Sequence, residues 1–288
     1  MTDDRVHLDI DAANGIARIT IDNPERKNAY DPPMRQRMHE LLDELADDDL
    51  VKVVVLRGSG GVFSTGADMN NAYNWYGGKN GAPTKSKRPS QRTRLLTDRR
   101  IFEFYQALIA YPKVTVAEVS GYALGGGLEM ALAADIAVVG SDAVLGMPAT
   151  RFLGPALGSL QLFFHRLGPV LARRLLLTGD SIHGSDVAHL GVFTEVVEPD
   201  QVEARAAWWA HKASRMPADG IVMAKQAFAL VESLTAYAGE QHISPLVHTW
   251  GTNLQFAEGE FNFVKARAEH GARGAFERRD AHFNVPEP

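Results

Sequence analysis

Three consecutive glycines, at positions 125–127, interrupt the most apolar long segment of this chain, which runs from residue 114 to residue 140. The β-branched residues before them predict a buried strand at residues 114–119, and the strong helix formers after them predict a helix at residues 128–134. Residues 121–127 contain too many glycines for regular structure. The segment therefore predicts a strand, an irregular turn, a helix and a second strand.

The glycines lie where the chain enters the predicted helix, and the first turn of a helix has unpaired N–H groups and the positive end of the dipole. Because glycine has no side chain, a backbone N–H can approach a ligand closely here, and an anion would be stabilised. Glu129 follows within the first helical turn. Tight packing, with Glu129 complementing the dipole, would explain the same residues.

A second junction of the same kind follows a predicted strand at residues 51–57. The sequence FSTGADM at residues 63–69 places Gly66 and Ala67 between that strand and the next segment, which Asp68 could cap. Two such junctions can direct two backbone N–H groups toward one carbonyl oxygen.

Further short motifs lie before and after these junctions, in a fixed order along the chain. They are Asn23-Pro24, Lys27-Asn28-Ala29, VVVLRG at 53–58, FSTGAD at 63–68, GYALGGGLE at 121–129, Asp135-Ile136, Gly146-Met147-Pro148 and LTGD at 177–180. In this order, and over most of residues 10–200, they resemble the crotonase family, the enoyl-CoA hydratase/isomerase superfamily. Each motif alone is weak evidence, whereas the ordered set is specific.

The N-terminal half alternates short apolar strands with helices. Residues 6–11 and 16–22 alternate apolar and polar side chains around a turn and predict a β-hairpin. Asp31-Pro32-Pro33 then predicts the start of a helix that ends near Ala46, with one apolar face made of Met34, Met38, Leu41, Leu42 and Leu45. This alternation predicts an α/β core with parallel strands.

The resemblance implies more about the architecture than the alternation does. It implies a crotonase-like spiral of ββα units over residues 1–200 and a helical C-terminal region over residues 201–288, which covers the site and mediates assembly into homotrimers or hexamers. Helical periodicity agrees with this division at residues 201–214, 220–231, 242–256 and 260–279. Five aromatic residues that look exposed would suit a subunit contact, although core packing explains them equally well: Trp208, Trp209, Phe256, Phe261 and Phe263.

Residues 72–94 are the least regular part of the sequence and predict a long loop. Its basic residues are Lys79, Lys85, Lys87, Arg88, Arg92 and Arg94. A solvated basic loop explains them, and contact with substrate phosphates is the alternative. Tyr73, Trp75 and Tyr76 at its start could shape an acyl pocket.

Charge and composition argue against several other functions. The formal net charge of −5 over 288 residues gives no reason to expect nucleic-acid binding. With no cysteine, the chain has neither disulfides nor a thiol nucleophile, which fits a cytoplasmic location. The first residues lack the apolar segment of a secretory signal, and acidic residues break the apolar segment at residues 114–140, so we expect no membrane span.

The resemblance also implies a chemistry. Acyl-CoA enzymes of this type form a thioester enolate, whose negative oxygen is stabilised by two backbone N–H groups. By the same resemblance, Ala67 and Gly126 supply those N–H groups and Glu129 is the catalytic acid/base. No metal or redox cofactor is implied, since coenzyme A arrives as part of the substrate. The residues expected to contact the substrate or its coenzyme A are Lys27, Ala29, Thr65, Asp68, Met69, Gly125 and Ala149.

The chain departs from the family pattern directly after Gly146-Met147-Pro148. Hydratases of the family have a second glutamate there, whereas this chain has Ala149, and no aspartate or glutamate occurs from residue 143 to residue 179. Candidates to replace the lost acid are Tyr76, Tyr122, Arg151 and His165. Arg151 would stay protonated, and it would favour a carboxylate-bearing acyl group if it lined the pocket.

The sequence thus predicts an acyl-CoA-processing enzyme with a single acid/base glutamate, nominally an enoyl-CoA hydratase or isomerase. A divergent hydrolase, decarboxylase or isomerase that uses the same enolate is one alternative. A catalytically impaired acyl-CoA binder is another, because one acid is missing while both glycine junctions remain.

Overall fold

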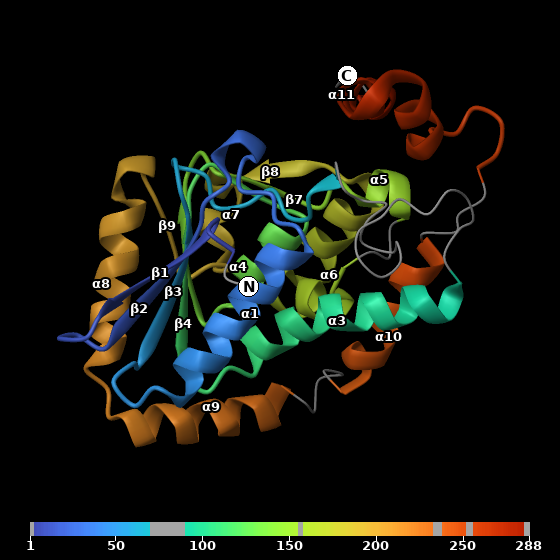
Figure 1. The fold of residues 1–288 in the computed structure, drawn as a ribbon. Coiled ribbons are helices and arrows are strands. Elements are labelled where there is room, and N and C mark those ends of the chain that lie inside the picture. Colours follow the sequence, from blue (N-terminus) through green and yellow to red (C-terminus); the bar gives the residue numbers. More distant parts are fainter. Residues whose placement is uncertain (1–2, 70–89, 155–157, 233–237, 252–255, 285–288) are drawn as a thin grey trace.

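The computed structural model describes residues 3–69, 90–154, 158–232, 238–251 and 256–284. Its main element is a six-stranded sheet in the order β1-β2-β3-β4-β6-β9 (Figure 1). These strands are β1 (Val6–Asp11), β2 (Ile16–Ile21), β3 (Val53–Gly58), β4 (Val114–Val119), β6 (Ile136–Gly140) and β9 (Glu195–Val197). β1 and β2 form the predicted antiparallel hairpin, and the other neighbouring strands are parallel, as predicted.

A second sheet has the order β5-β7-β8, with β5 (Tyr122–Leu124), β7 (Val144–Gly146) and β8 (Ser181–His183). The prediction of an irregular turn over residues 121–127 is wrong here, because β5 pairs in parallel with β7 and helix α4 (Gly126–Ala133) begins within the glycines. Propensity scales disfavour glycine in helices and strands, whereas close packing requires glycine at these positions. A Cβ atom on Gly127 would lie 2.2 Å from the carbonyl oxygen of Ser64.

Helices lie around both sheets (Figure 1). They are α1 (Pro32–Asp47), α3 (Gln91–Ile109), α4 (Gly126–Ala133), α5 (Thr150–Leu153), α6 (Leu160–Thr178), α7 (Gly184–Val187), α8 (Val202–Ser214), α9 (Ala218–Glu232), α10 (Ala238–Gly251) and α11 (Phe263–Phe283). Short 3-10 turns occur at η1 (Pro24–Arg26), η3 (Ala188–Leu190) and η4 (Pro199–Gln201). None of the helices in the described part of the chain combines the length and apolarity needed to cross a bilayer.

The six-stranded sheet is covered on both faces, so its central strands are apolar runs rather than alternating ones. Val53 and Val55 of β3 pack with α8 on one face, whereas Val54 and Leu56 belong to the larger core on the other face. Helix α1 contributes to that larger core and forms as predicted, with Asp31 accepting the N–H of Met34 at 3.1 Å as its cap. The five predicted apolar residues of α1 are all buried: Met34, Met38, Leu41, Leu42 and Leu45.

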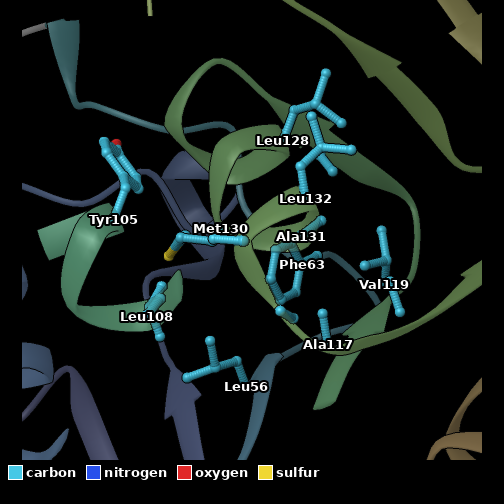
Figure 2. Close-up of a cluster of buried hydrophobic side chains, with 14 of the residues drawn as sticks. Leu56, Phe63, Tyr105, Leu108, Ala117, Val119, Leu128, Met130, Ala131 and Leu132 are labelled. Carbon is cyan, nitrogen blue, oxygen red and sulfur yellow. The ribbon is translucent and has the colours of Figure 1, made fainter. Parts of the chain in front are cut away.

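Helix α4 runs through the larger core. Figure 2 shows Met130 directed toward Tyr105 and Leu108 of α3, whereas Leu128 and Leu132 lie on another side of the helix. Every residue of α4 after Gly126 is buried. The helix that begins in the glycine turn therefore carries its acid into the interior of the protein.

Helix α3 begins at Gln91, so the long loop predicted over residues 72–94 ends earlier than expected. Ser90 caps the helix by accepting the N–H of Thr93 at 3.3 Å. Arg92 is exposed, whereas Arg94 is buried on α3, so it does not belong to a solvated loop. The remaining basic and aromatic residues of that prediction lie outside the described residues.

The four C-terminal helices lie within a few residues of their predicted positions, and core packing, the alternative to an exposed contact surface, holds for part of the aromatic set. Phe263 is 4% exposed and stacks on Phe152 of α5 with ring centroids 4.6 Å apart. Trp209 is half-buried, and its indole N–H donates to Glu195 at 2.9 Å. Helical spacing alone could not separate these packed rings from the exposed Trp208. The division of the chain at residue 200 stays a prediction.

Candidate active site

The two glycine junctions lie side by side, because the segment around Ser64 runs along β5. The N–H of Leu124 donates to the carbonyl oxygen of Ser64 at 3.0 Å. A Cβ atom on Gly66, whose φ is +81°, would lie 2.8 Å from the backbone nitrogen of Gly126. Ala67, directly after Gly66, is thus brought close to the first turn of α4.

The N–H groups of Ala67 and Gly126 have no hydrogen-bond partner among the described residues. Gly126 is the first residue of α4, where a helical N–H lacks an intrahelical partner. Two unpaired N–H groups on contacting segments can bind one carbonyl oxygen and stabilise negative charge on it.

Glu129 is buried, with 5% of its surface exposed. Its Oε1 accepts two hydrogen bonds from Ser159, one from the backbone N–H and one from the hydroxyl, each at 2.8 Å. Burying a carboxylate is unfavourable unless such donors compensate it. Since both donors belong to one buried residue, they also fix the direction of the carboxylate.

Sequence reasoning missed Ser159. The available signal was its place directly before α6, after a glycine that permits close packing. A Cβ atom on Gly158 would lie 3.3 Å from Oε1 of Glu129 and 3.0 Å from the terminal methyl group of Met147. Small residues at 158 and 159 therefore let the chain approach the carboxylate.

Two buried tyrosines adjoin the same turn. The hydroxyls of Tyr30 and Tyr105 are hydrogen-bonded to each other, and both lie against Gly126. Burial raises the pKa of each phenol above its ordinary value, and the negative charge of Glu129 raises it further, so both stay protonated at neutral pH. Sequence reasoning missed both tyrosines, although Tyr30 directly follows Ala29 of a family motif.

Comparison with known proteins identifies the family of this chain. The family model described as Enoyl-CoA hydratase/isomerase matches residues 11–271. The chain belongs to the enoyl-CoA hydratase/isomerase family. Its structure is similar to a crystal structure of enoyl-CoA hydratase from Mycobacterium smegmatis, with a TM-score of 0.84 and 28% identity over 96% of this chain and 93% of that one. An enoyl-CoA hydratase/isomerase from Xanthobacter autotrophicus gives a TM-score of 0.80 and 26% identity over 99% and 100% of the two chains. The predicted crotonase-like α/β fold is therefore confirmed.

Relatives by sequence include the 2,3-dehydroadipyl-CoA hydratase of Escherichia coli, 29% identical over 77% of this chain and 81% of the relative. The bovine mitochondrial enoyl-CoA hydratase domain-containing protein 2 is 33% identical over 67% of this chain. The match spans only 61% of that bovine protein's length. The comparisons thus establish the family, and the reaction is to be proposed from the site.

In this family member, several predicted substrate-binding residues lie together. The carbonyl oxygen of Lys27 accepts the N–H of Thr65 at 3.1 Å, and the Lys27 ammonium lies 4.1 Å from the centre of the Tyr122 ring. The N–H of Gly125 donates to the carbonyl oxygen of Gly146 at 2.9 Å, which places β7 beside the glycine turn. This pairing brings the segment that leads to Ala149 toward the same turn.

Other predicted binding residues are less accessible. Ala29 and Asp68 are buried, with 7% and 8% exposed. The carbonyl oxygen of Met69 accepts a hydrogen bond from Arg267 of α11 at 2.6 Å. Ala149 is half-buried at the start of α5 and packs against apolar residues of the core. Among the residues the structure describes, no group of three or more histidine, cysteine or acidic side chains is arranged to hold a metal ion.

Two of the candidates to replace the second acid, Arg151 and His165, lie near acidic side chains of the protein itself. Arg151 pairs with Asp180 at 2.8 Å and lies 3.8 Å from Asp280, so its charge is already balanced. The preference for a carboxylate-bearing substrate, which depends on Arg151 lining the acyl pocket, stays a prediction. His165 lies on α6 with 40% of its side chain exposed, 3.9 Å from Glu232. Tyr76 lies outside the described residues.

Proposed function

We propose that this chain is an acyl-CoA-processing enzyme that stabilises a thioester enolate. The thioester oxygen accepts the N–H groups of Ala67 and Gly126, and the carboxylate of Glu129 takes or gives a proton at the acyl carbons. A backbone donor of this kind typically contributes about 10²–10³ in rate, and a positioned acid or base about 10²–10⁴.

The observation that carries the proposal is a buried, oriented carboxylate in the first turn of α4, on the helix that begins with one of two amides that have no partner among the described residues. Glu129 lies in the first turn of the helix that Gly126 begins, and Ser159 holds its Oε1 with two donors. A carboxylate kept in an apolar core at a helix entrance is a recognised mark of a functional site. The contact between Gly66 and Gly126 supports the convergence of the two amides.

Ala149 restricts the proposed reaction to chemistry with one acid/base. A methyl group can neither move a proton nor activate water, so hydration by two acids is not available in its usual form. Glu129 can still move one proton between acyl carbons or activate one water. Isomerisation, hydrolysis and decarboxylation through the same enolate are therefore the alternative reactions within this proposal.

Coenzyme A is proposed to enter as part of the substrate. The proposed contact residues remain Lys27, Ala29, Thr65, Asp68, Met69, Gly125 and Ala149. Lys27 supports this placement, since its ammonium lies next to Tyr122 of β5 on the segment leading to the glycine turn.

Steady-state assays with short, long, branched and dicarboxylic enoyl-CoA substrates test the proposal. The dicarboxylic member follows the name of the Escherichia coli relative. Glu129→Gln is expected to lower kcat by about 100-fold or more while acyl-CoA binding is retained. Glu118→Gln is the matched control, because Glu118 is also buried but lies on β4 beside Arg57.

Three outcomes would contradict the proposal. Tight acyl-CoA binding without turnover of any substrate would favour the impaired binder. Unchanged turnover in Glu129→Gln would show that Glu129 is not the catalytic acid/base. Loss of activity in Glu118→Gln as well would show that burial of charge, rather than the site, determines the result.

We also infer that the chain assembles with copies of itself through helix α9. Five apolar side chains of this helix are exposed: Val222, Met223, Phe228, Leu230 and Val231. Exposed apolar patches of this kind mark contact surfaces. Light scattering is expected to give the mass of a trimer or hexamer, and Met223→Glu is expected to shift the mass toward that of a monomer. A monomeric wild type would contradict the inference.

A cytoplasmic location also stays a prediction.

A further inference from the structure

Tyr30 contacts both of the segments proposed to bind the thioester oxygen. Its N–H donates to the carbonyl oxygen of Gly66 at 2.9 Å, and its carbonyl oxygen accepts the N–H of Asp68 at 2.8 Å. These two hydrogen bonds hold Ala67 from both sides in a short parallel bridge. The backbone of Tyr30 therefore fixes the position of one proposed amide.

The side chain of Tyr30 reaches the other proposed amide. A Cβ atom on Gly126 would lie 1.9 Å from the Tyr30 hydroxyl oxygen, so this oxygen is in contact with the Cα of Gly126. One residue thus spans the two segments, with its backbone on Ala67 and its hydroxyl on Gly126. The separation of the two amides depends on where that hydroxyl lies.

Tyr105 of α3 holds the hydroxyl in place. The two phenol oxygens are hydrogen-bonded, and a Cβ atom on Gly126 would lie 2.3 Å from the Tyr105 oxygen. Tyr30 is 1% exposed and Tyr105 is 3% exposed, so neither hydroxyl can exchange its partner for bulk water. The hydroxyl pair packs against Gly126 and therefore limits how far the first residue of α4 can move.

The charges of Glu129 on α4 and Arg35 on α1 act on the tyrosine pair. Burial is the main cause of the raised pKa of each phenol, Glu129 adds to it, and Arg35 opposes it. Both phenols therefore remain neutral when Glu129 is ionised. They act through position and dipole rather than by taking the proton of Glu129.

We propose that Tyr30 and Tyr105 are positioning residues that set the distance between the N–H groups of Ala67 and Gly126. This proposal rests on the proposed function, because it concerns the geometry of the same oxyanion site. Misplacement by about 1 Å can lower a rate by about 100-fold. Removal of either hydroxyl is therefore expected to lower kcat more than it changes KM.

The test compares Tyr30→Phe, Tyr105→Phe and the double variant with Tyr111→Phe. Tyr111 is a matched control, because its buried hydroxyl donates to the carbonyl oxygen of Leu42 at 2.8 Å, away from the glycine turns. We expect kcat to fall about tenfold or more in each single variant, with KM within about twofold. The double variant should be no worse than the poorer single one, because one hydrogen bond joins the two hydroxyls. Tyr111→Phe should retain its kcat.

A second measurement does not depend on turnover. Infrared difference spectra of a bound acyl-CoA report the polarisation of the thioester carbonyl, whose stretching band moves to lower frequency when two N–H groups donate to it. The shift is expected in the wild type and in Tyr111→Phe, and a smaller shift in Tyr30→Phe. If Tyr30→Phe does not fold, Tyr105→Phe gives the same comparison with Tyr30 intact.

The outcomes separate this proposal from the proposed function. A wild type that neither turns over any acyl-CoA nor shifts the carbonyl band would overturn the proposed function itself. The wild type could instead turn over an acyl-CoA and shift the carbonyl band. If Tyr30→Phe and Tyr105→Phe then matched it in kcat and band position, the positioning role alone would be overturned. An equal fall in Tyr111→Phe would also overturn it, because any buried tyrosine would then have the same effect.

Discussion

Ser159 binds Glu129 through two donors on a single oxygen, with its N–H and its hydroxyl both 2.8 Å from Oε1. Ser159→Ala removes only the hydroxyl, so the carboxylate keeps the backbone N–H of residue 159 and gains freedom to turn. We expect kcat to fall about tenfold and the free energy of unfolding to fall by about 1–3 kcal/mol. Kinetics and urea denaturation measure both. Ser214→Ala is the control, since it removes a buried hydroxyl from α8, and equal kcat in the two variants would contradict the prediction.

Gly126 has no room for a side chain, because a Cβ atom would lie 1.9 Å from the Tyr30 hydroxyl and 2.3 Å from that of Tyr105. Gly126→Ala is expected to lower kcat by about 100-fold and stability by about 1–3 kcal/mol. Adding Tyr30→Phe removes the nearer oxygen and should restore part of the stability. Thermal denaturation checks this against Gly220→Ala in α9, whose Cβ would meet only the Cβ of Pro217 at 3.8 Å, an ordinary contact. If both alanine variants lost the same stability, the predicted clash at Gly126 would be refuted.

Local sequence patterns predicted the hairpin, helix α1 and the parallel core, because each depends on hydrophobic periodicity and caps that lie close together in the chain. The predicted start of α4 was wrong for a tertiary reason. A glycine occupies this helical position because Ser64, distant in sequence, leaves no space for a side chain there. Propensity scales contain no information about such contacts.

The candidate site shows the same limit. Glu129, Ala67 and Gly126 were identified from motifs, whereas their supporting residues Ser159 and Tyr105 come from segments whose sequence carries no distinguishing pattern. Arg151 was expected to favour a substrate carboxylate if it lined the pocket, and its pairing with Asp180 could not be predicted from the motif that contains Asp180. Pairings between distant side chains require the structure.

Helix α10 is fixed to α3 by a buried polar cluster. His248 Nδ1 lies 3.1 Å from Asp98 Oδ1, and the Thr249 hydroxyl donates to Asp98 Oδ2 at 2.7 Å. Asp98 has no exposed surface, so removal of the imidazole by His248→Ala is expected to destabilise the fold by about 2 kcal/mol or more. Urea denaturation measures this. His270→Ala should change stability by less than about 0.5 kcal/mol, because His270 contacts Glu269 at the surface, and equal losses would count against the prediction.

Glu118 is a buried acid outside the proposed site, and burial raises the pKa of its carboxyl above the ordinary 4.5 despite Arg57 at 3.6 Å. A carboxyl with a raised folded-state pKa binds its proton more tightly when folded. It therefore favours folding most at low pH, and this contribution is lost as the pH rises through the folded-state value. Glu118→Gln cannot ionise, so its Tm should exceed that of the wild type by about one or two degrees at pH 8, with the difference vanishing near pH 4. A Glu118→Gln variant less stable than the wild type at pH 8 would mean that attraction to Arg57 outweighs burial.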